Sequence, residues 1–461
     1  MNEQTNEIDI EIPRKSIELI ISELNLDNSK EELVIEHIPI IVPKGFFNSF
    51  LNIVKLVLYD CKLDKMPRSI LNLSNLKYLD LSNNNILFIP IEIGSIKTLK
   101  TLKYENTNCR PLTDFINVSN FKDLIEISQF IMDRQQIQPP VRNFLPYNNQ
   151  DCFTIMSYNI LCSKYTDQSI YPLCLKKCLD FNYRFPLILE EIKKYRPHII
   201  CLQEVQYGLF FSKFQPEIES LGYKGLYSPK DMYAKAKEAD KPFVLGQATF
   251  ISITEKDDEN EHKIYFEVES ELVTNVAFRS SPYLKQGNCP RKTKKYSETA
   301  LIVNVKVKRS NDENDKDYSI SIVNTHLQWK PTCDDVRADQ LKIAVAHAVE
   351  LAKQKNNSYD IIVCGDFNSY PDTPAIAFMN NHPEHFISAY DAMKQPFYLS
   401  HLTCDFEGLL DYIYTTQNRI EVASILPLYP DEVIHSMALE MPDTFHPSDH
   451  LPIVAALRIK K

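Results

Sequence analysis

The chain has 461 residues, of which 44% are hydrophobic and 24% are charged, and its formal net charge is −10. This length suits two or three domains, and the composition is that of a globular protein with a large core. The negative charge argues against a protein that coats DNA through a general positive field. An enzyme whose acidic site binds a divalent cation beside a phosphate remains compatible with it.

The eleven cysteines are scattered along the chain and contain no CxxC pair. Cys174 and Cys178 lie one helical turn apart, but no second pair completes a zinc site. We therefore predict reduced thiols. Because no apolar run reaches the length of a membrane span, we expect no membrane partner.

Three segments in the first third of the chain repeat with a period of 23 residues, beginning at Ile53, Leu76 and Leu99. The first, fourth and sixth positions of each segment are leucine, isoleucine or, once, tyrosine. This frame is typical of leucine-rich repeats, in which short strands line a concave face and the leucines stack into a continuous core. We predict a short leucine-rich-repeat domain over residues 1–135, with helical caps near residues 1–30 and 112–135.

Residues 136–150 are rich in proline and lack periodicity, which predicts a linker. From residue 151 to 461, many strand-like runs alternate with a few helical ones, such as residues 185–195 and 338–355. This pattern predicts an α/β domain in which two sheets pack together and the helices lie outside them.

Six predicted strand termini in this domain carry carboxylate, carboxamide or imidazole side chains and no lysine or arginine. Ligands and catalytic groups collect at strand ends in α/β folds, although any one of these residues alone is equally typical of a turn or a cap. They are Asn159, Glu204, His326, Asp366 with Asn368, Asp411, and Asp449 with His450.

The chemistry of this set suits attack of water on a phosphodiester. Glu204, helped by Asn159, suits a hard cation such as Mg²⁺, which takes one or two carboxylates from a protein. Asp366, held by Asn368, could orient and deprotonate water. A second proton carrier or phosphate donor is His450, with its tautomer fixed by Asp411; His326 could donate to a phosphate oxygen.

At these residues the sequence resembles the exonuclease–endonuclease–phosphatase superfamily, through SYNIL, LQEV, NTHLQWKP, GDFNSYPD, DYIY and PSDHLPI in this order. Because repeats precede the domain, it resembles more narrowly the carbon catabolite repressor type of deadenylase, the nuclease subunit of the Ccr–Not complex. The stretch between the first two motifs, with Tyr183 and Arg184, is similar to that family too.

The resemblance implies a 3′-to-5′ exoribonuclease that uses a pair of Mg²⁺ ions, shortens mRNA poly(A) tails and releases AMP. It implies that the repeats dock onto a second deadenylase subunit, and that the protein is cytoplasmic and nuclear. By position it assigns metal binding to Glu204, Asn159 and Asp449, and catalysis to Asp366, Asn368, His450, His326 and Asp411.

The resemblance also implies that a substrate base stacks on Phe406 and that Pro331 packs on a base. From the sequence alone, Phe406 is equally well interpreted as an aromatic residue of the core. We expect Trp329, the one tryptophan, to be a packing anchor. The chain departs from the family pattern in two segments. One is VLGQATFI, where Leu245 and Gln247 differ, and the other is Lys295-Tyr296-Ser297. The basic stretch 285–295 is either a track for RNA phosphates or a solvated loop.

The sequence is also compatible with two other functions. A phosphodiesterase or phosphatase of the same superfamily would keep the fold and act on DNA or nucleotides. An inert scaffold would bind partners through its repeats, but such domains usually lose their metal ligands, and here Glu204, Asp366 and His450 are present.

Overall fold

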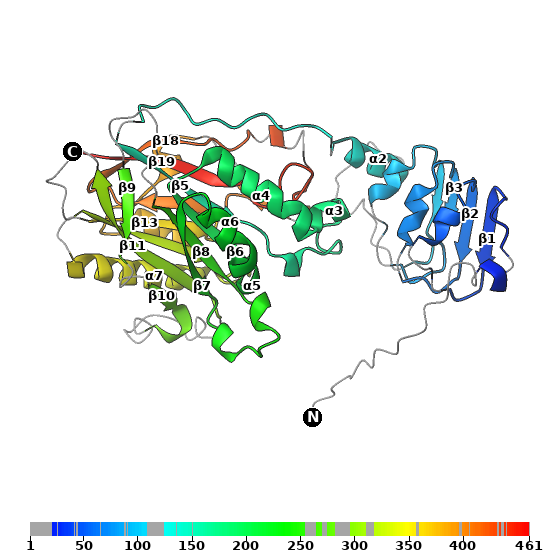
Figure 1. Ribbon diagram of the computed structural model, residues 1–461, viewed down its shortest axis with the longest axis horizontal. Helices are drawn as coiled ribbons and strands as arrows, with labels where there is room; N and C mark the ends of the chain where they lie inside the picture. Colours follow the sequence, from blue (N-terminus) through cyan, green and yellow to red (C-terminus); the bar gives the residue numbers. More distant parts are fainter. Residues whose placement is uncertain are drawn as a thin grey trace. The chain divides into compact units, whose positions relative to one another are not determined.

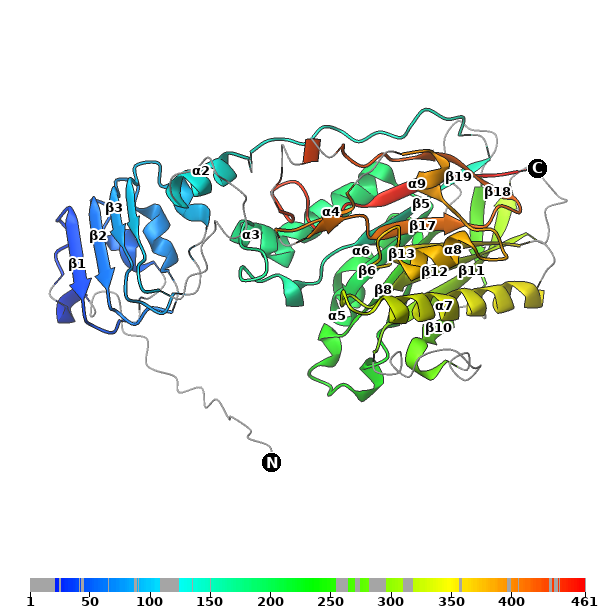
Figure 2. The same ribbon diagram turned by 180° about the vertical axis from the view of Figure 1, so that it is seen from behind.

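The protein is described from a computed structural model, which divides into two compact units, Met1–Gln136 and Ile137–Lys461. Figure 1 and Figure 2 show the ribbon from two sides. In the part of the chain that the structure describes, no helix has the length and apolar character needed to cross a bilayer. The described residues are 21–24, 26–40, 42, 45–64, 66–86, 89, 91–107, 124–134, 136–149, 151–253, 264–269, 274–281, 296–309, 318–355, 359–395, 399–404, 406–430, 433–434, 438 and 440–460.

The first unit contains a four-stranded parallel sheet in the order β1-β2-β3-β4 (Figure 1). Its strands keep a register of 23 residues, because Glu32 pairs with Lys55, Lys55 with Tyr78 and Tyr78 with Thr101. The strands are β1 (Glu32–Glu36), β2 (Lys55–Tyr59), β3 (Tyr78–Asp80) and β4 (Thr101–Lys103), connected through the 3₁₀ turns η1 (Phe46–Ser49), η2 (Arg68–Asn72) and η3 (Ile91–Ser95).

The periodic leucines of this unit form its core. Leu56, Leu79 and Leu81 have no exposed surface. Asn84 is buried between neighbouring turns, where its Oδ1 accepts from the amides of Cys61 and Leu63 and its Nδ2 donates to the carbonyls of Leu58 and Leu81. The asparagine therefore satisfies backbone groups that the tight turns leave without partners.

Part of each predicted cap lies outside the described residues. Residues 21–23 are helical, and α2 (Leu124–Arg134) covers the end of the second predicted cap. In the predicted linker, the Arg142 guanidinium donates to the carbonyls of Leu426, Pro427 and Pro452. From Ile137 onward this stretch belongs to the second unit, and these bonds tie it to the rest of that unit.

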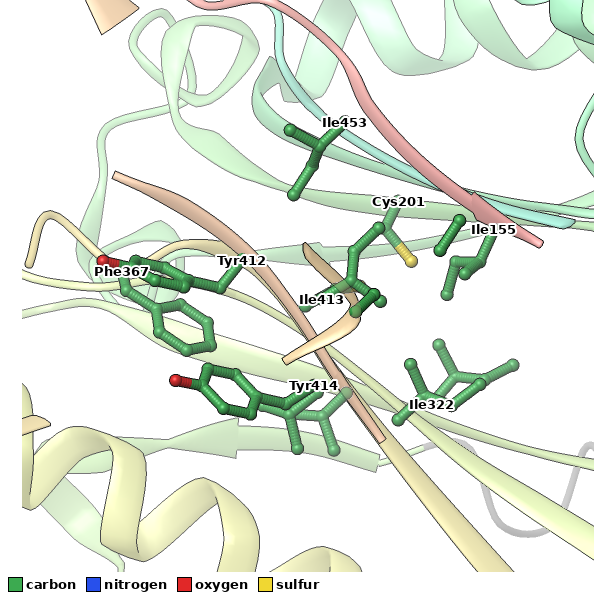
Figure 3. Close-up of a cluster of buried hydrophobic side chains, with 14 of the residues drawn as sticks. Ile155, Cys201, Ile322, Phe367, Tyr412, Ile413, Tyr414 and Ile453 are labelled. Carbon is green, nitrogen blue, oxygen red and sulfur yellow. The ribbon is translucent and has the colours of Figure 1, made fainter. Parts of the chain in front are cut away.

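The second unit is a sandwich of two sheets, as predicted from the alternation of strands and helices. The six-stranded sheet has the order β18-β19-β5-β6-β8-β7, and the seven-stranded sheet has the order β10-β11-β12-β13-β17-β14 with β9 paired to β11. Ile155, Cys201 and Ile453 of the first sheet pack with Ile322 and Ile413 of the second in one buried cluster (Figure 3).

The strands of the six-stranded sheet are β5 (Cys152–Asn159), β6 (Ile199–Gln206), β7 (Tyr223–Pro229), β8 (Leu245–Ser252), β18 (Ile420–Ile425) and β19 (Ile453–Ile459). The other sheet contains β9 (Ile264–Val268), β10 (Thr274–Ala277), β11 (Thr299–Arg309), β12 (Ser319–His326), β13 (Tyr359–Asp366), β14 (Ile387–Ser388) and β17 (Asp411–Thr415). A separate hairpin pairs β15 (His401–Leu402) with β16 (Glu407–Gly408).

Helices cover both outer faces of the sandwich. Ile188 and Ile192 of α4 (Phe181–Tyr195) pack on the six-stranded sheet, and Leu341 and Ala344 of α7 (Asp334–Lys355) pack on the other (Figures 1 and 2). The shorter helices are α3 (Lys176–Leu179), α5 (Tyr207–Leu209), α6 (Gln215–Glu219), α8 (Pro374–Asn380) and α9 (Ala389–Ala392), with η5 (Ser163–Tyr165), η6 (Phe210–Phe214), η7 (Tyr233–Lys235), η8 (Lys241–Phe243) and η10 (Phe278–Ser280).

The departures from the family pattern have different surroundings. Gln247 is buried in β8, and its Oε1 accepts from the Thr299 hydroxyl of the other sheet at 3.0 Å. The side-chain amide of Gln247 is therefore hydrogen-bonded inside the sandwich. The Tyr296 hydroxyl lies 3.3 Å from the Cys333 sulfur. Lys295 and the basic stretch 285–295 lie outside the described residues.

Candidate active site

Strand register brings three of the predicted residues side by side. His326 ends β12 and pairs with Asp366 at the end of the parallel strand β13. Asp366 in turn pairs with Asp411, the first residue of the antiparallel strand β17. From the facing sheet, Asn159 at the end of β5 donates through Nδ2 to Asp366 Oδ2 at 3.0 Å. The two sheets therefore contribute to one polar cluster at the same edge of the sandwich.

Asp366 lies at the centre of this cluster. Its Oδ2 is 3.6 Å from Nε2 of His326 and 3.6 Å from Nε2 of His450. Its Oδ1 accepts from the amide of Asn368 at 2.8 Å. Burial raises the pKa of the Asp366 carboxyl to about 7, because the charge of Asp411 adds to the desolvation and the charge of His450 only partly offsets it. This carboxylate can therefore take up or release a proton near neutral pH.

The pKa of His450 is also raised, which for an imidazole favours the charged form. Its Nδ1 lies 2.7 Å from Oδ2 of Asp411, and its side chain is buried. Burial alone would lower the pKa of His450, but the carboxylates of Asp411 and Asp366 raise it to about 10. The imidazole is therefore held positively charged, with Nε2 directed toward Asp366 and Asn159. A charged imidazole in this position can donate a proton or bind a phosphate oxygen.

His326 is neutral in the same cluster. Its burial, together with the positive charges of Lys230 and His450, holds the pKa of His326 well below the usual range. Within the described part of the chain, its Nδ1 makes no hydrogen bond and lies 4.0 Å from Oε1 of Glu204. An unpartnered buried nitrogen is costly, which is compatible with a ligand at this position.

Glu204 sits in an irregular part of its strand. The pairing of β6 with β8 shifts between Leu202 and Val205, and Glu204 has a φ of 60°. Such backbone strain in a residue with a side chain is concentrated at functional sites. Oε2 of Glu204 accepts from the amide of Cys162 at 2.9 Å, whereas the contacts of Oε1 with described residues are longer, 3.4 Å to Asn159 Nδ2 and 4.0 Å to His326 Nδ1. One carboxylate oxygen is thus available for a cation.

Asp449 and Asn159 differ in what they offer a metal. Asp449 Oδ2 accepts from the Tyr171 hydroxyl at 2.7 Å and lies 3.4 Å from Nε2 of His401. The oxygen of the Asn159 amide accepts from the amide of Leu161, so Asn159 turns its nitrogen toward the carboxylates. In this arrangement Asn159 orients carboxylates, and Asp449 belongs to a group with His401.

The donors in the cluster fit a divalent cation. Among the described residues, two groups bring ligand atoms within 4.8 Å of one another: Asp366, Asp411 and His450, and His401, Asp449 and His450. Carboxylate oxygens suit Mg²⁺ or Mn²⁺, whereas an imidazole nitrogen suits Zn²⁺ and binds a metal only after it loses its proton. Oε1 of Glu204 and Oδ1 of Asp411, which has no hydrogen-bond partner in the described chain, add to this capacity.

The remaining predicted residues border the cluster. Asn368 Nδ2 donates to the carbonyl of Leu327 at 3.1 Å and so ties the loop after β13 to the loop after β12. Phe406 is half-buried, with its ring 5.3 Å from that of Tyr370 and 5.2 Å from that of His401. Pro331 is exposed. The packing role expected for Trp329 is wrong, because its side chain is 63% exposed.

Sequence reasoning missed two residues beside the cluster. Lys230 follows β7 directly, and its charge acts on His326, so a lysine does stand at one strand end. Glycine and proline are uncommon in strands, so those around β7 weaken its strand pattern, and Lys230 is therefore not recognised from the sequence as a residue at a strand end. His401 forms a β-bridge with His450 and lies 4.6 Å from it between ring centroids. His401 begins a hairpin whose two strands have only two residues each, so its local sequence shows no strand pattern.

Arg184 bonds to the segments that carry the cluster and has no exposed surface. Its guanidinium donates to the carbonyls of Ile160, Leu161 and Pro447 at 2.8–2.9 Å. These carbonyls belong to the segments that carry Asn159 on one side and Asp449 with His450 on the other. Arg184 is therefore a positioning residue that joins the two segments.

We expect Arg184→Lys to lower kcat more than it raises KM, because one ammonium cannot hold three carbonyls in a fixed fork. Steady-state kinetics and thermal unfolding measure the effect. Arg196→Lys, at the exposed C-terminal end of the same helix, is the control and should change neither quantity. Equal kinetics in the Arg184→Lys variant and the wild type would contradict the positioning role.

A two-sheet sandwich with carboxylates and imidazoles gathered at one edge offers the groups that hydrolysis of a phosphate ester requires. Residues 156–450 match the Endonuclease/Exonuclease/phosphatase family, and the chain belongs to this family.

Curated relatives refine this placement. The chain is 31% identical over 349 residues to the CCR4-Not complex 3′-5′-exoribonuclease subunit Ccr4 of Candida albicans, covering 68% of this chain and 42% of that protein. It is 29% identical over 332 residues to 2′,5′-phosphodiesterase 12 of Homo sapiens, covering 66% of this chain and 51% of that protein. The resemblance to the Ccr–Not nuclease inferred from the motifs is confirmed. The chain matches about half the length of these relatives.

Among solved structures, the 2′,3′-cyclic phosphatase ANGEL2 in complex with adenosine-2′,3′-vanadate has a TM-score of 0.55 and 23% identity. The match covers 70% of this chain and 100% of that chain. This likeness supports the sandwich fold alone.

Proposed function

We propose that the protein is a Mg²⁺-dependent 3′-5′ exoribonuclease that shortens poly(A) tails and releases AMP. The observation that carries the proposal is the meeting of Asn159, Glu204, His326, Asp366 and His450 at one edge of the sandwich. The similarity to an exoribonuclease subunit of the CCR4-Not complex supports RNA as the substrate class.

In this proposal Glu204 and Asp449 would hold the Mg²⁺ ions, and Asn159 orients the carboxylates. When bound, a divalent cation neutralises charge on the phosphate. Asp366 accepts the proton of the attacking water. The new bond joins the water oxygen to phosphorus, the bond from phosphorus to the 3′ oxygen of the preceding nucleotide breaks, and His450 gives that oxygen its proton. His326 donates to a non-bridging phosphate oxygen, and Phe406 and Pro331 contact the base.

The direct test is digestion of oligo(A) carrying a 5′ label by the full chain, with Mg²⁺ or with EDTA. We expect shortening by single nucleotides, AMP as the released product, and no reaction in EDTA. Internal fragments or free inorganic phosphate would contradict an exonuclease. Comparison with oligo(U) measures the preference for adenine.

A second candidate follows from the near-equal similarity to 2′,5′-phosphodiesterase 12. The same cluster would then cut a 2′-5′ linkage, since the attacking water and the carboxylates need not change. Parallel digestion of 2′-5′-linked and 3′-5′-linked oligoadenylate separates the two candidates. A higher kcat/KM for the 2′-5′ linkage would favour the second.

For the first unit, we propose a leucine-rich-repeat array that binds a second deadenylase subunit of the Ccr–Not type. The 23-residue register of its parallel strands and the buried Asn84 support this interpretation. Lys55→Glu should weaken capture of that subunit without changing hydrolysis of short oligo(A). Cytoplasmic and nuclear localisation belongs to the same proposal, and none of the nine cysteines within the described residues is in a disulfide, which is compatible with a reducing compartment.

A further inference from the structure

Trp329 is exposed where the chain could have buried it. It is the one tryptophan in the sequence, and 63% of its side chain is accessible. Tryptophan is highly buried on average, because its large ring gains much from leaving water. The residue lies on the loop after β12, three positions beyond His326 of the polar cluster. An exposed ring at this position suggests a surface for a ligand.

The loop that carries Trp329 is fixed from one side. Arg337 of α7 is buried, and its guanidinium donates to the carbonyls of Gln328 at 3.0 Å and Lys330 at 2.7 Å. The amide of Gln328 donates to Oε1 of Gln340 at 2.9 Å. The backbone on both sides of Trp329 is therefore held by buried groups, and the indole is presented outward from a firmly bonded loop.

The same loop is bonded to the catalytic cluster. The amide of Leu327 donates to the carbonyl of Asp366, and the carbonyl of Leu327 accepts from the side chain of Asn368. The side chain of Gln328 donates to Glu298, whose carboxylate lies 3.7 Å from the Lys230 ammonium. Trp329 is thus anchored at one border of the cluster, on the side where Lys230 lies.

The chemistry around the indole suits a single-stranded nucleic acid. The ammonium of Lys330 lies 5.9 Å from the centroid of the Trp329 ring. An aromatic face with a neighbouring cation combines a stacking surface for a base with a charge for its phosphate.

The position of Trp329 relative to Phe406 decides which base it contacts. Strand β13, which carries Asp366, lies between β12 and β17. Trp329 follows β12, whereas Phe406 packs on His401, which is bridged to His450 on the side of β17. The two aromatic rings therefore border different sides of Asp366, and Trp329 precedes Pro331 by two residues on its loop, so its ring is placed to contact the base next to the one held by Phe406 and Pro331.

We propose that Trp329 stacks on a base upstream of the scissile bond in single-stranded RNA, and that Lys330 contacts the adjoining phosphate. The inference rests on the proposed ribonuclease function, in which the terminal base lies at Phe406. The Trp329 subsite reads no particular base, because every base has a face on which an indole can stack. It holds the RNA strand while the terminal nucleotide is removed.

A single tryptophan makes the test direct, because all indole fluorescence of the chain comes from this residue. The full chain in EDTA is titrated with oligo(A), with AMP and with an oligomer of abasic deoxyribose phosphate. We expect oligo(A) to quench the fluorescence at saturation, and AMP and the abasic oligomer to leave it nearly unchanged. Equal quenching by AMP, or by the abasic oligomer, would overturn the upstream stacking site.

Variants separate stacking from charge. Anisotropy of labelled oligo(A) should show binding weakened about tenfold in Trp329→Ala, and far less in Trp329→Phe, which retains a ring. Lys330→Gln should lower the slope of log K against log salt by about 0.7, the value for one phosphate contact. Lys103→Gln is the matched control, because Lys103 also lies over a ring, Tyr78, but in the first unit.

Failure of this inference is distinguishable from failure of the proposed function. If the chain releases AMP in Mg²⁺ but oligo(A) does not quench Trp329, the stacking site is overturned and the exonuclease stands. If oligo(A) quenches Trp329 but no AMP is released in Mg²⁺, the exonuclease is overturned and the binding site stands.

Discussion

Asp366→Asn is expected to reduce hydrolysis of oligo(A) by about 10²–10⁴-fold, the range that a positioned acid or base contributes. Asparagine keeps the size of the side chain and can still accept from the Asn368 amide. It cannot take a proton from water, and it loses the charge that faces His326 and His450. The measurement is kcat/KM on oligo(A) at saturating Mg²⁺.

The same variant should become more stable relative to the wild type as pH rises. The pKa of Asp366 is about 7 in the folded chain and near its ordinary, lower value in the unfolded chain. Its contribution to stability is therefore present at low pH and is lost as pH rises through about 7. In EDTA, the difference in Tm between Asp366→Asn and wild type should be larger at about pH 8 than at about pH 5.

The control for this prediction is Asp372→Asn, since Asp372 is exposed in the loop that follows Asp366. It should change neither kcat/KM nor the pH dependence of Tm. An Asp366→Asn variant with wild-type activity would remove Asp366 from the proposed chemistry. A variant that is inactive but has the same pH dependence of Tm as the wild type would contradict the raised pKa of Asp366 and leave its role in the reaction in place.

The positions of the polar residues at strand ends could be predicted because strands have simple geometry. A run of buried β-branched residues such as Ile361–Val363 marks the position of the strand. The polar residue at the end of that strand, Asp366, is therefore expected at the sheet edge. The 23-residue period predicted the register of the first unit for a related reason, because each repeat must place its leucines on those of its neighbour.

What could not be predicted depends on contacts between distant segments. His401 reaches the cluster through a bridge to His450, and nothing in its local sequence encodes that pairing. Trp329 is exposed on a loop whose neighbouring carbonyls are bonded by Arg337 of the following helix. Hydrophobicity alone favours burial of such a residue, and in the case of Trp329 it gave the wrong expectation.

The irregular backbone at Glu204 is a third example. Its strand reads as regular, yet the pairing of β6 with β8 shifts between Leu202 and Val205, and Glu204 adopts a positive φ. A β-bulge of this kind redirects a side chain near an active site. The strained residue is also the carboxylate with an available oxygen, so its conformation and its proposed role in metal binding belong together.

Glu204→Gln is therefore expected to weaken Mg²⁺ binding by at least about 10²-fold, more than loss of a group that only orients a ligand. Glutamine retains an oxygen that can accept from the Cys162 amide, so the local backbone should stay in place. What it removes is the negative charge that a hard cation requires. Calorimetric titration with Mg²⁺ measures the affinity, and oligo(A) digestion should fall in parallel and recover in part at high Mg²⁺ concentration.

Glu217→Gln is the matched control, because Glu217 is exposed on α6 and has the same charge and length. Binding of oligo(A) in EDTA should be the same in the wild type and in both variants, since neither glutamate belongs to the Trp329 subsite. Retained Mg²⁺ affinity in Glu204→Gln would move the metal to the His401, Asp449 and His450 group. In that case the positive φ of Glu204 would serve to orient its side chain within the cluster, and Asp449→Asn would become the variant that loses the metal.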